Sequence, residues 1–415
     1  MAQLSDDCFA FGGELLTLDA ALHAIATIDC LAVVEFVPLG AADGRVLARD
    51  VIAPIDLPPF DNAAVDGYAV RLADVSAAVA LPVDGRLAAG AAIAAPLRPA
   101  TARRIFTGAA LPAGADTIFM QEDVRLDGKG GVFLPAGLKQ GANTRPRGED
   151  IAAGVRALRQ GQMLQPRHLA LAAALGFSEL PVRTPIRVAL FSTGDELVDP
   201  GLPAGSGRRY DSNRVLLAAL ARRTGALVTD LGILPDRHDA IAAALAEAAH
   251  GHDLILTSGG VSVGEEDHVR SAIEAGGRLT FWRLAIKPGR PVAMGTIAGT
   301  PFVGLPGNPV AAFITFVHVA RPLIAALMGA RAEPPARFPV RAAFGYRKKA
   351  GRREYVRVRI APGDDGSPVA HKHPVEGAGI LTSLTETTGL VELPEPVTRV
   401  APGDSVLYLP YELLL

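Results

Sequence analysis

The stretch Thr257-Ser-Gly-Gly-Val-Ser-Val-Gly-Glu-Glu-Asp267 indicates an α/β fold, because it joins an apolar, strand-like run to a helical pattern through a glycine-rich loop. Its glycines allow a ligand to approach the backbone closely, and the N-terminus of the following helix offers free N–H groups to an anion. Its three carboxylates repel an anion unless a cation lies between them. The stretch therefore fits a site for phosphate and magnesium, and it fits equally well a turn followed by a helix with a favourable acidic start.

Strands and helices alternate on both sides of this stretch, from residue 185 to residue 328. The alternation predicts a doubly wound, mostly parallel sheet with helices on both faces, in which ligands bind at the carboxyl ends of the strands. Loops 192–196, 257–267 and 305–309 each follow a predicted strand, so we expect all three at one edge of the sheet. The expected strands are 186–191, 227–234, 253–257, 279–286, 291–295 and 302–303, and the expected helices are 213–224, 239–249, 267–275 and a buried helix over 310–328.

The flanking parts of the chain have different patterns. Residues 16–28 and 161–176 carry apolar residues at helical spacing, whereas the segment between them consists of short β-like runs separated by glycine and proline. After Pro334 the pattern is again that of a small β domain. We therefore predict a multidomain α/β plus β chain in which a β-rich domain is inserted into a helical one. The predicted domains are residues 1–50 together with 150–182, then 51–149, 183–330 and 331–415.

The composition limits the class of protein. The chain has 415 residues with 41 Lys+Arg and 43 Asp+Glu, and this formal net charge of −2 argues against a general nucleic-acid binder. Its two cysteines have no partners at metal-ligand spacing, which favours a reducing compartment over a disulfide framework or a zinc site. The start of the chain lacks the pattern of a signal peptide, and the apolar run near 310–317 is too short and too interrupted to cross a membrane. We therefore expect a cytoplasmic protein that binds neither nucleic acid nor a membrane.

Acidic and basic side chains lie close to the central loop in the predicted topology. Asp195 and Glu196 directly follow a strand, where they could share a cation with that loop or simply face water. Asp236 also follows a strand, but N-capping of the next helix explains it as well. Lys287 and Arg290 stand on a turn between prolines, so they are presented at low entropic cost and could bind phosphate or another oxyanion. The alternative interpretation is that Lys287 and Arg290 are ordinary solvated residues of a turn.

Other candidates have plain structural alternatives. Asn308 can cap the buried helix, which explains the stretch 304–309 without a ligand. Asp61 and Thr107, in the β-rich block, fit ordinary turns as well as contacts to a ligand of a neighbouring domain. The basic residues between 347 and 359 fit a solvated face, with anchoring of an anionic substrate as the less favoured interpretation.

Taken together, these stretches resemble the molybdopterin molybdenumtransferase family, which includes MoeA and the gephyrin E domain. The resemblance covers nearly the whole chain, whereas adenylyltransferases of the MogA type resemble only its central part. This chain departs from the family pattern at Ala63, Val65, Arg290 and Ala311, where Ser, Met, Lys and Ser are common. The motifs that carry the resemblance are 61–69, 107–108, 143–150, 192–197, 210–213, 257–267, 287–291 and 304–309.

The resemblance implies a homodimer with an elongated linker and dimerisation domain, a MogA-like central domain and a C-terminal small β-barrel. It implies molybdenum cofactor biosynthesis, in which molybdate and adenylylated molybdopterin react with Mg²⁺ as cofactor and AMP is released. The catalytic residues would be Asp195, Glu196, Asp236, Asp267, Lys287 and Arg290, and Glu196, Asp236 and Asp267 would hold the metal. The substrate would be bound by Asp61, Thr107, Gly259, Gly260, Ser262, Gly264, Pro306, Asn308, Arg352 and Ser383, with Asp61 and Thr107 supplied by the partner chain.

A MogA-type adenylyltransferase and molybdoenzyme apoproteins would be further partners. Two other functions stay open. A non-catalytic scaffold that binds a pterin or a nucleotide would share the glycine loops but would not need all four carboxylates. A serine hydrolase is also conceivable, because residues 260–264 match G-x-S-x-G and would make Ser262 the nucleophile. Ser258 and Gly259 separate that motif from its strand, however, and no oxyanion segment accompanies it.

Overall fold

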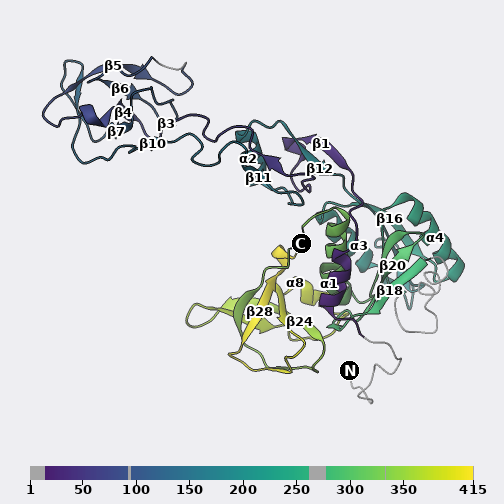
Figure 1. Ribbon diagram of the computed structural model, residues 1–415. Coiled ribbons are helices and arrows are strands. Elements are labelled where there is room, and N and C mark those ends of the chain that lie inside the picture. The colour runs from purple at the N-terminus through teal and green to yellow at the C-terminus, as the bar shows by residue number, and fades with distance from the viewer. Residues whose placement is uncertain (1–14, 92–94, 261–276, 332, 415) are drawn as a thin grey trace.

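The computed structural model describes residues 15–91, 95–260, 277–331 and 333–414. The chain is elongated (Figure 1). A β-rich domain lies at one end, a narrow linker domain follows it, and the central α/β domain and the C-terminal β domain lie next to each other at the opposite end. The predicted multidomain α/β plus β architecture is confirmed.

The central domain is built on a six-stranded sheet with the order β16-β13-β17-β21-β20-β18. The pairings between β16, β13, β17 and β21 are parallel, and β20 and β18 add two antiparallel strands at one side. The sheet is therefore mostly parallel, as predicted. Its strands are β13 (Arg187–Thr193), β16 (Leu227–Leu234), β17 (Leu254–Ser258), β18 (Gly277–Arg283), β20 (Pro291–Ile297) and β21 (Thr300–Leu305).

Helices cover both faces of this sheet. Alternate residues of β13 point to opposite faces: Leu190 packs in the core cluster that contains α3 (Ser212–Arg223), whereas Phe191 packs in the cluster that contains α4 (His238–Gly251). The first cluster also includes α1 (Leu18–Ala26), which begins at its predicted N-cap, Thr17. Thus α1 packs into the central core although it falls within the range predicted for the linker domain.

One helical run, Pro309–Leu327, crosses this core as predicted. It consists of α6 (Pro309–Thr315), the π-helical turn η3 (Phe316–Ala320) and α7 (Arg321–Leu327). Within the described part of the chain it is long and apolar enough to cross a membrane, but most of it is buried inside the protein. Such an all-round apolar surface is expected of a core helix.

The linker domain carries short sheets beside a helix. Strand β1 (Val34–Pro38) pairs with β12 (Glu179–Arg183), and β2 (Val51–Ile52) pairs with β11 (Arg156–Leu158). The helix α2 (Pro166–Ala174) lies within the predicted range 161–176. These pairs join segments that precede the β-rich block to segments that follow it. The β-rich block is therefore inserted into the linker domain.

The inserted domain contains a six-stranded sheet with the order β7-β4-β6-β5-β9-β8. A two-stranded sheet of β3 (Asn62–Ala63) and β10 (Thr144–Arg145) closes the start of the domain against its end. The strands of the larger sheet are β4 (Gly67–Val70), β5 (Leu81–Leu87), β6 (Ala102–Ile105), β7 (Thr117–Met120), β8 (Arg125–Leu126) and β9 (Gly131–Phe133).

The C-terminal domain is a small closed barrel. The order β24-β25-β22-β28-β26 returns to β24, because β24 pairs with both β25 and β26. The strand β19 (Ile286–Lys287) of the central domain pairs in parallel with β24, so that Lys287 lies opposite Glu354. The two domains are thus joined by backbone hydrogen bonds. The barrel strands are β22 (Phe338–Ala342), β24 (Arg353–Pro362), β25 (Pro368–Lys372), β26 (Gly389–Leu393) and β28 (Ser405–Pro410).

Candidate active site

The carboxyl ends of β13, β17 and β21 meet at one edge of the central sheet, as predicted from their order. At this edge the amide of Gly259 donates to the carbonyl oxygen of Leu305 at 3.0 Å. Gly259 has φ +88°, and a Cβ there would lie 2.8 Å from the carbonyl oxygen of Thr193. Only glycine fits this close approach of two strand ends, since other residues avoid positive φ and need space for a side chain.

Asn213, near the start of α3, connects two loops of this edge. Its Nδ2 donates to Ser258 Oγ at 2.9 Å and to the carbonyl oxygen of Gly307 at 2.9 Å. The side chain is buried, and its Oδ1 has no hydrogen-bond partner among the described residues. Buried polar atoms normally have partners, so this oxygen is open to a ligand or a water molecule at the strand ends.

Three of the predicted acidic residues lie at the same edge. Asp195 follows β13, and its Oδ1 accepts from the backbone amide of Asp236 at 3.3 Å, which brings these two residues together. Glu196 instead accepts from Arg209 at 2.5 Å. Among the described residues, no group of three or more His, Cys, Asp or Glu side chains is close enough to hold a metal ion. Asp267, the fourth predicted acid, lies outside the described residues.

Arg214 fixes the loop that follows these acids. It is buried and forms ion pairs with Asp199, with Asp211 at 3.1 Å and with Asp230 at 2.7 Å. Burial disfavours its charge, but the hydrogen bonds of Asp230 and Asp211 outweigh burial and hold the pKa of Arg214 above its ordinary value. The loop between Glu196 and α3 is therefore anchored at one buried cation.

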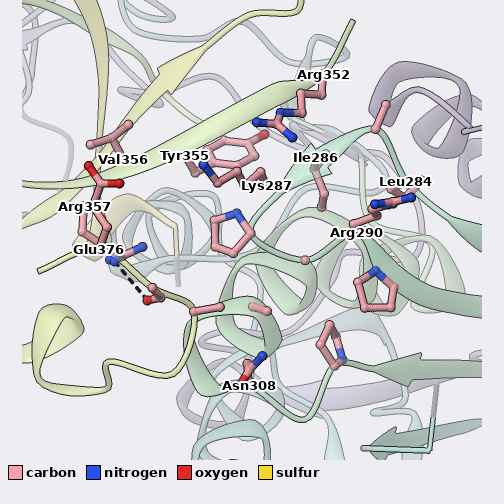
Figure 2. Close-up of a pocket in the computed structure, with 18 of the residues that line it drawn as sticks. Leu284, Ile286, Lys287, Arg290, Asn308, Arg352, Tyr355, Val356, Arg357 and Glu376 are labelled. Atoms are coloured by element: carbon pink, nitrogen blue, oxygen red, sulfur yellow. Dashed lines mark hydrogen bonds between the residues drawn. The ribbon is translucent and has the colours of Figure 1, made fainter. Parts of the chain in front are cut away.

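A cavity of about 360 Å³ lies between the central domain and the barrel, next to the strand ends. Pro306 and Asn308 contribute to it from the loop after β21, and Lys287 and Arg290 contribute from the turn before β20 (Figure 2). The barrel adds the predicted Arg352. The structure therefore brings five of the predicted site residues to one cavity. Arg357 and Lys372 of the barrel also line it.

The buried carboxylate of Glu354 lies behind the cationic wall of this cavity. It accepts from Arg352 Nε at 2.6 Å and from the hydroxyl of Tyr346 at 2.7 Å, and Lys287 Nζ lies 3.4 Å away. The Glu354 side chain is 1% exposed. Burial and the hydrogen bond to Glu354 hold the pKa of Tyr346 above its ordinary value, so this hydroxyl stays a donor. One carboxylate thus orients two predicted anion-binding cations, and it was not among the predicted site residues.

Two predicted substrate-binding residues belong to the β-rich domain, which lies at the opposite end of the molecule from the central and C-terminal domains (Figure 1). Thr107 donates from its amide and its hydroxyl to Asp66 Oδ1, both at 2.8 Å, and these bonds lower the pKa of Asp66. Asp61 Oδ1 accepts from the amide of Arg147 at 2.7 Å. Both side chains therefore shape turns of their own domain, and the prediction that they serve a partner's site stays a prediction.

The structure does not bring Ser383 to the cavity. It lies in α8 (Thr382–Thr385), is fully buried, and donates its hydroxyl to the carbonyl oxygen of Ile380 at 2.5 Å. Its hydroxyl is therefore occupied within its own turn. Gly260 follows Gly259 at the end of β17 and also has positive φ. Ser262 and Gly264 lie outside the described residues. The nucleophile of the alternative serine hydrolase function, which is Ser262, therefore lies outside them as well.

Comparisons with known proteins agree with this architecture. Residues 16–176 match the family model for the MoeA N-terminal region (domain I and II), residues 189–326 match that of a probable molybdopterin binding domain, and residues 339–411 match the MoeA C-terminal region (domain IV). A crystal structure of a molybdopterin biosynthesis protein, MoeA from Pyrococcus horikoshii OT3, is similar over 96% of this chain and all of that chain, with a TM-score of 0.82 and 28% sequence identity.

Two curated relatives are similar along most of the sequence. Molybdopterin molybdenumtransferase of Haemophilus influenzae is 37% identical over 403 residues, which cover 97% of this chain and 100% of that protein. Molybdopterin molybdenumtransferase 2 of Mycobacterium tuberculosis is 41% identical over 387 residues, 89% of this chain and 93% of that protein. The chain therefore belongs to the MoeA family and is a molybdopterin molybdenumtransferase, an enzyme of molybdenum cofactor biosynthesis.

Proposed function

We propose that this enzyme inserts molybdate into adenylylated molybdopterin and releases AMP in a reaction that depends on Mg²⁺. The observation that carries the proposal is the cation-lined cavity beside the carboxyl ends of β13, β17 and β21. Both reactants are anions, so they repel each other in water. A positively charged cavity beside a glycine-lined edge offers each a separate place and removes part of that repulsion.

In this proposal the chain's own residues bind and orient the two substrates. Lys287, Arg290 and Arg352 attract molybdate, since ammonium and guanidinium groups form short, strong hydrogen bonds to oxyanions. The backbone at Gly259–Gly260 and the loop Pro306–Asn308 receive the phosphate of the pterin. The predicted contacts of Ser262 and Gly264 would extend this cradle.

The acidic residues fit a magnesium ion. Asp195 and Asp236 lie side by side, and Mg²⁺ in proteins is commonly held by one or two carboxylates together with substrate phosphates and water. Asp267 is expected to complete the set, whereas Glu196 would first have to leave Arg209. When bound, the ion would neutralise charge on the phosphoanhydride and ease release of the adenylate.

We further propose a cytoplasmic homodimer in which each β-rich domain serves the partner's site. The β-rich domain that carries Asp61 and Thr107 lies at the opposite end of the molecule from the central domain (Figure 1), which supports this arrangement. The apolar side chains of Val34 and Phe36 on β1, which are 37% and 57% exposed, support it as well. A MogA-type adenylyltransferase would supply the substrate, and molybdoenzyme apoproteins would receive the product.

The test uses the purified full-length protein with adenylylated molybdopterin and Mg²⁺. AMP release should occur with molybdate and should be absent when sulfate replaces it, and chelation of Mg²⁺ should stop it. Arg290→Gln should raise the KM for molybdate at least tenfold, whereas Arg347→Gln, the same change on an exposed barrel residue, should leave it unaltered. AMP release that is independent of molybdate would contradict the proposal.

A further inference from the structure

The side chain of Tyr346 lies on the barrel side of the cavity, beside the ammonium group of Lys287. It belongs to β23 (Tyr346–Arg347), which pairs with β27 (Arg399–Val400). Its hydroxyl donates to Glu354 Oε2 at 2.7 Å, and Lys287 Nζ donates to the same hydroxyl at 3.5 Å. A phenolic hydroxyl can donate one hydrogen bond and accept another, so Tyr346 links a carboxylate of the barrel to a lysine of the central domain.

The ring of Tyr346 lies close to two ammonium groups. Lys287 Nζ is 5.9 Å from the centre of the ring, and Lys372 Nζ is 5.8 Å from it. An ammonium group within about 6 Å of an aromatic ring is attracted by the negative face of the ring. Lys287 belongs to β19 and Lys372 belongs to β25. One aromatic ring therefore attracts two like charges that come from different domains.

The two lysines differ in their carboxylate partners. Lys372 pairs with Glu376, which lies four residues further along the chain. Lys287 pairs with Glu354 at 3.4 Å, but that carboxylate also accepts from Arg352 at the shorter distance of 2.6 Å. The Lys287 side chain is 49% exposed and ends a flexible four-carbon stem, and an ion pair of this exposure restrains a lysine only weakly. The tyrosine therefore adds a restraint that the shared carboxylate does not supply.

The position of the Lys287 ammonium group matters more for reaction than for attraction of an anion. A mobile ammonium group brings the same net charge to the cavity as a fixed one, so the attraction at long range is almost unchanged. A fixed group also donates at a defined point, and preorganised donors lower the free energy of a transition state without reorganisation.

We propose that Tyr346 is a positioning residue of the transferase, whose hydroxyl and ring together hold the ammonium group of Lys287 in one place at the cavity. Its loss should lower the rate of the reaction more than the affinity for molybdate. The restraint of Lys287 is a property of the folded chain, and only its effect on turnover rests on the proposed function.

The first test measures AMP release at varied molybdate in the full-length protein. Tyr346→Phe keeps the ring without the hydroxyl and should lower kcat about three- to tenfold, and Tyr346→Leu, which loses both, should lower it further. The KM for molybdate should stay within about twofold in both variants, because no charge is removed. Tyr408→Phe is the matched control and should keep wild-type kinetics. Tyr408 belongs to the same barrel core, donates to the carbonyl oxygen of Thr388 at 2.7 Å and does not line the cavity.

A double-mutant cycle separates positioning of Lys287 from general support of the fold. If Tyr346 acts through Lys287, Tyr346→Phe should change kcat by less than about twofold in a Lys287→Met background. Thermal unfolding checks that each variant is folded. Wild-type kcat in Tyr346→Leu would overturn the proposal, as would a full loss of kcat by Tyr346→Phe in the Lys287→Met background or a raised KM for molybdate at unchanged kcat.

A second measurement needs no turnover and decides the question if Lys287→Met is inactive. Acylation of single lysines by an N-hydroxysuccinimide ester of acetate is followed by mass spectrometry of peptides. Tyr346→Leu should raise the rate at Lys287 several-fold and leave unaltered the rate at Lys139, an exposed lysine of the β-rich domain. An unchanged rate at Lys287 in the folded Tyr346 variants would refute the restraint. Faster acylation of Lys287 in these variants, together with absence of AMP release by the wild-type protein, would refute the proposed function alone.

Discussion

Glu354→Gln is the substitution that most directly tests how the cavity is organised. It keeps the size of the side chain and one oxygen that can accept from Tyr346, but it removes the negative charge between two cations. In the structure that charge lies 2.6 Å from Arg352 Nε and 3.4 Å from Lys287 Nζ. The substitution therefore removes the carboxylate partner of both cations without replacing a residue that lines the cavity.

The interactions of Glu354 with Arg352 and with Lys287 differ in free energy. A hydrogen bond to a charged group contributes about 1.5–3 kcal/mol, and the side chain of Arg352 is only 23% exposed, so most of that value applies. The Lys287 side chain is 49% exposed, and solvent screening limits its contribution to about 1 kcal/mol or less. If the orientation of Arg352 is needed in the transition state, a loss of about 2 kcal/mol lowers kcat roughly 30-fold.

The affinity for molybdate should not fall together with kcat. Removal of a carboxylate makes the cavity more positive, so the KM for molybdate should stay constant or fall. The assay is AMP release at varied molybdate, with thermal unfolding as a check of the fold. Glu395→Gln is the matched control, since Glu395 pairs with Arg353 at 3.2 Å and contacts neither cation of the cavity. A raised KM at unchanged kcat would refute the positioning role, as would an equal effect in Glu395→Gln.

Three further outcomes follow from the described contacts. Gly259→Ala should destabilise the protein by about 1–3 kcal/mol, because the new Cβ would meet the Thr193 carbonyl oxygen at 2.8 Å in a left-handed conformation, whereas Gly307→Ala, with 3.9 Å to its nearest neighbour, should be nearly neutral in thermal unfolding. Asn213→Ala should cost about 1–3 kcal/mol and lower kcat, since two loops lose their shared donor; wild-type kinetics would contradict that link. Burial, helped by nearby arginines, holds the pKa of His318 at about 3, below its ordinary 6.5. On acidification the unfolded chain is therefore protonated first, and stability present above pH 6.5 should fall by about 1.4 kcal/mol per pH unit between these values. His318→Phe should flatten this slope in urea unfolding at pH 7 and pH 5, and an unchanged slope would assign it to other groups.

Much of the central domain could be predicted because its signals are local. The strand over 227–234 and the buried helix over 310–328 follow from apolar runs and their spacing. The meeting of three loops at one edge follows from the geometry of parallel strands. Lys287 and Arg290 could be found because proline and glycine around them mark an exposed turn.

The barrel side of the site was harder to predict because its signal is not local. Glu354 and Arg357 lie within a mostly basic stretch that resembles a solvated face, and β19 covers Glu354 only when it pairs with β24. One feature of the sequence does indicate that Glu354 is buried. Alternate residues of β24 point to the same face, and Glu354 shares a face with Val356 and Val358 of the barrel core. Ser383 was predicted as a site residue but is not part of the cavity, since its hydroxyl donates to the carbonyl oxygen of Ile380 in its own turn. Hydroxyl groups near a site are often satisfied locally, and sequence alone does not reveal it.

The placement of the cavity between two domains has a physical consequence of its own. Lys287 and Arg290 come from the central domain, and Arg352 and Arg357 come from the barrel, so the cations of the two domains repel each other across the cavity. Glu354 offsets that repulsion on one side, where β19 pairs with β24. On the other side, Arg357 forms no ion pair with a described carboxylate, although the charge of Glu376 acts on it, and a bound anion would add negative charge there. Anion binding should therefore tighten the contact between the domains, and phosphate or molybdate should slow amide hydrogen exchange in β19 of the wild-type protein but not of Arg357→Gln.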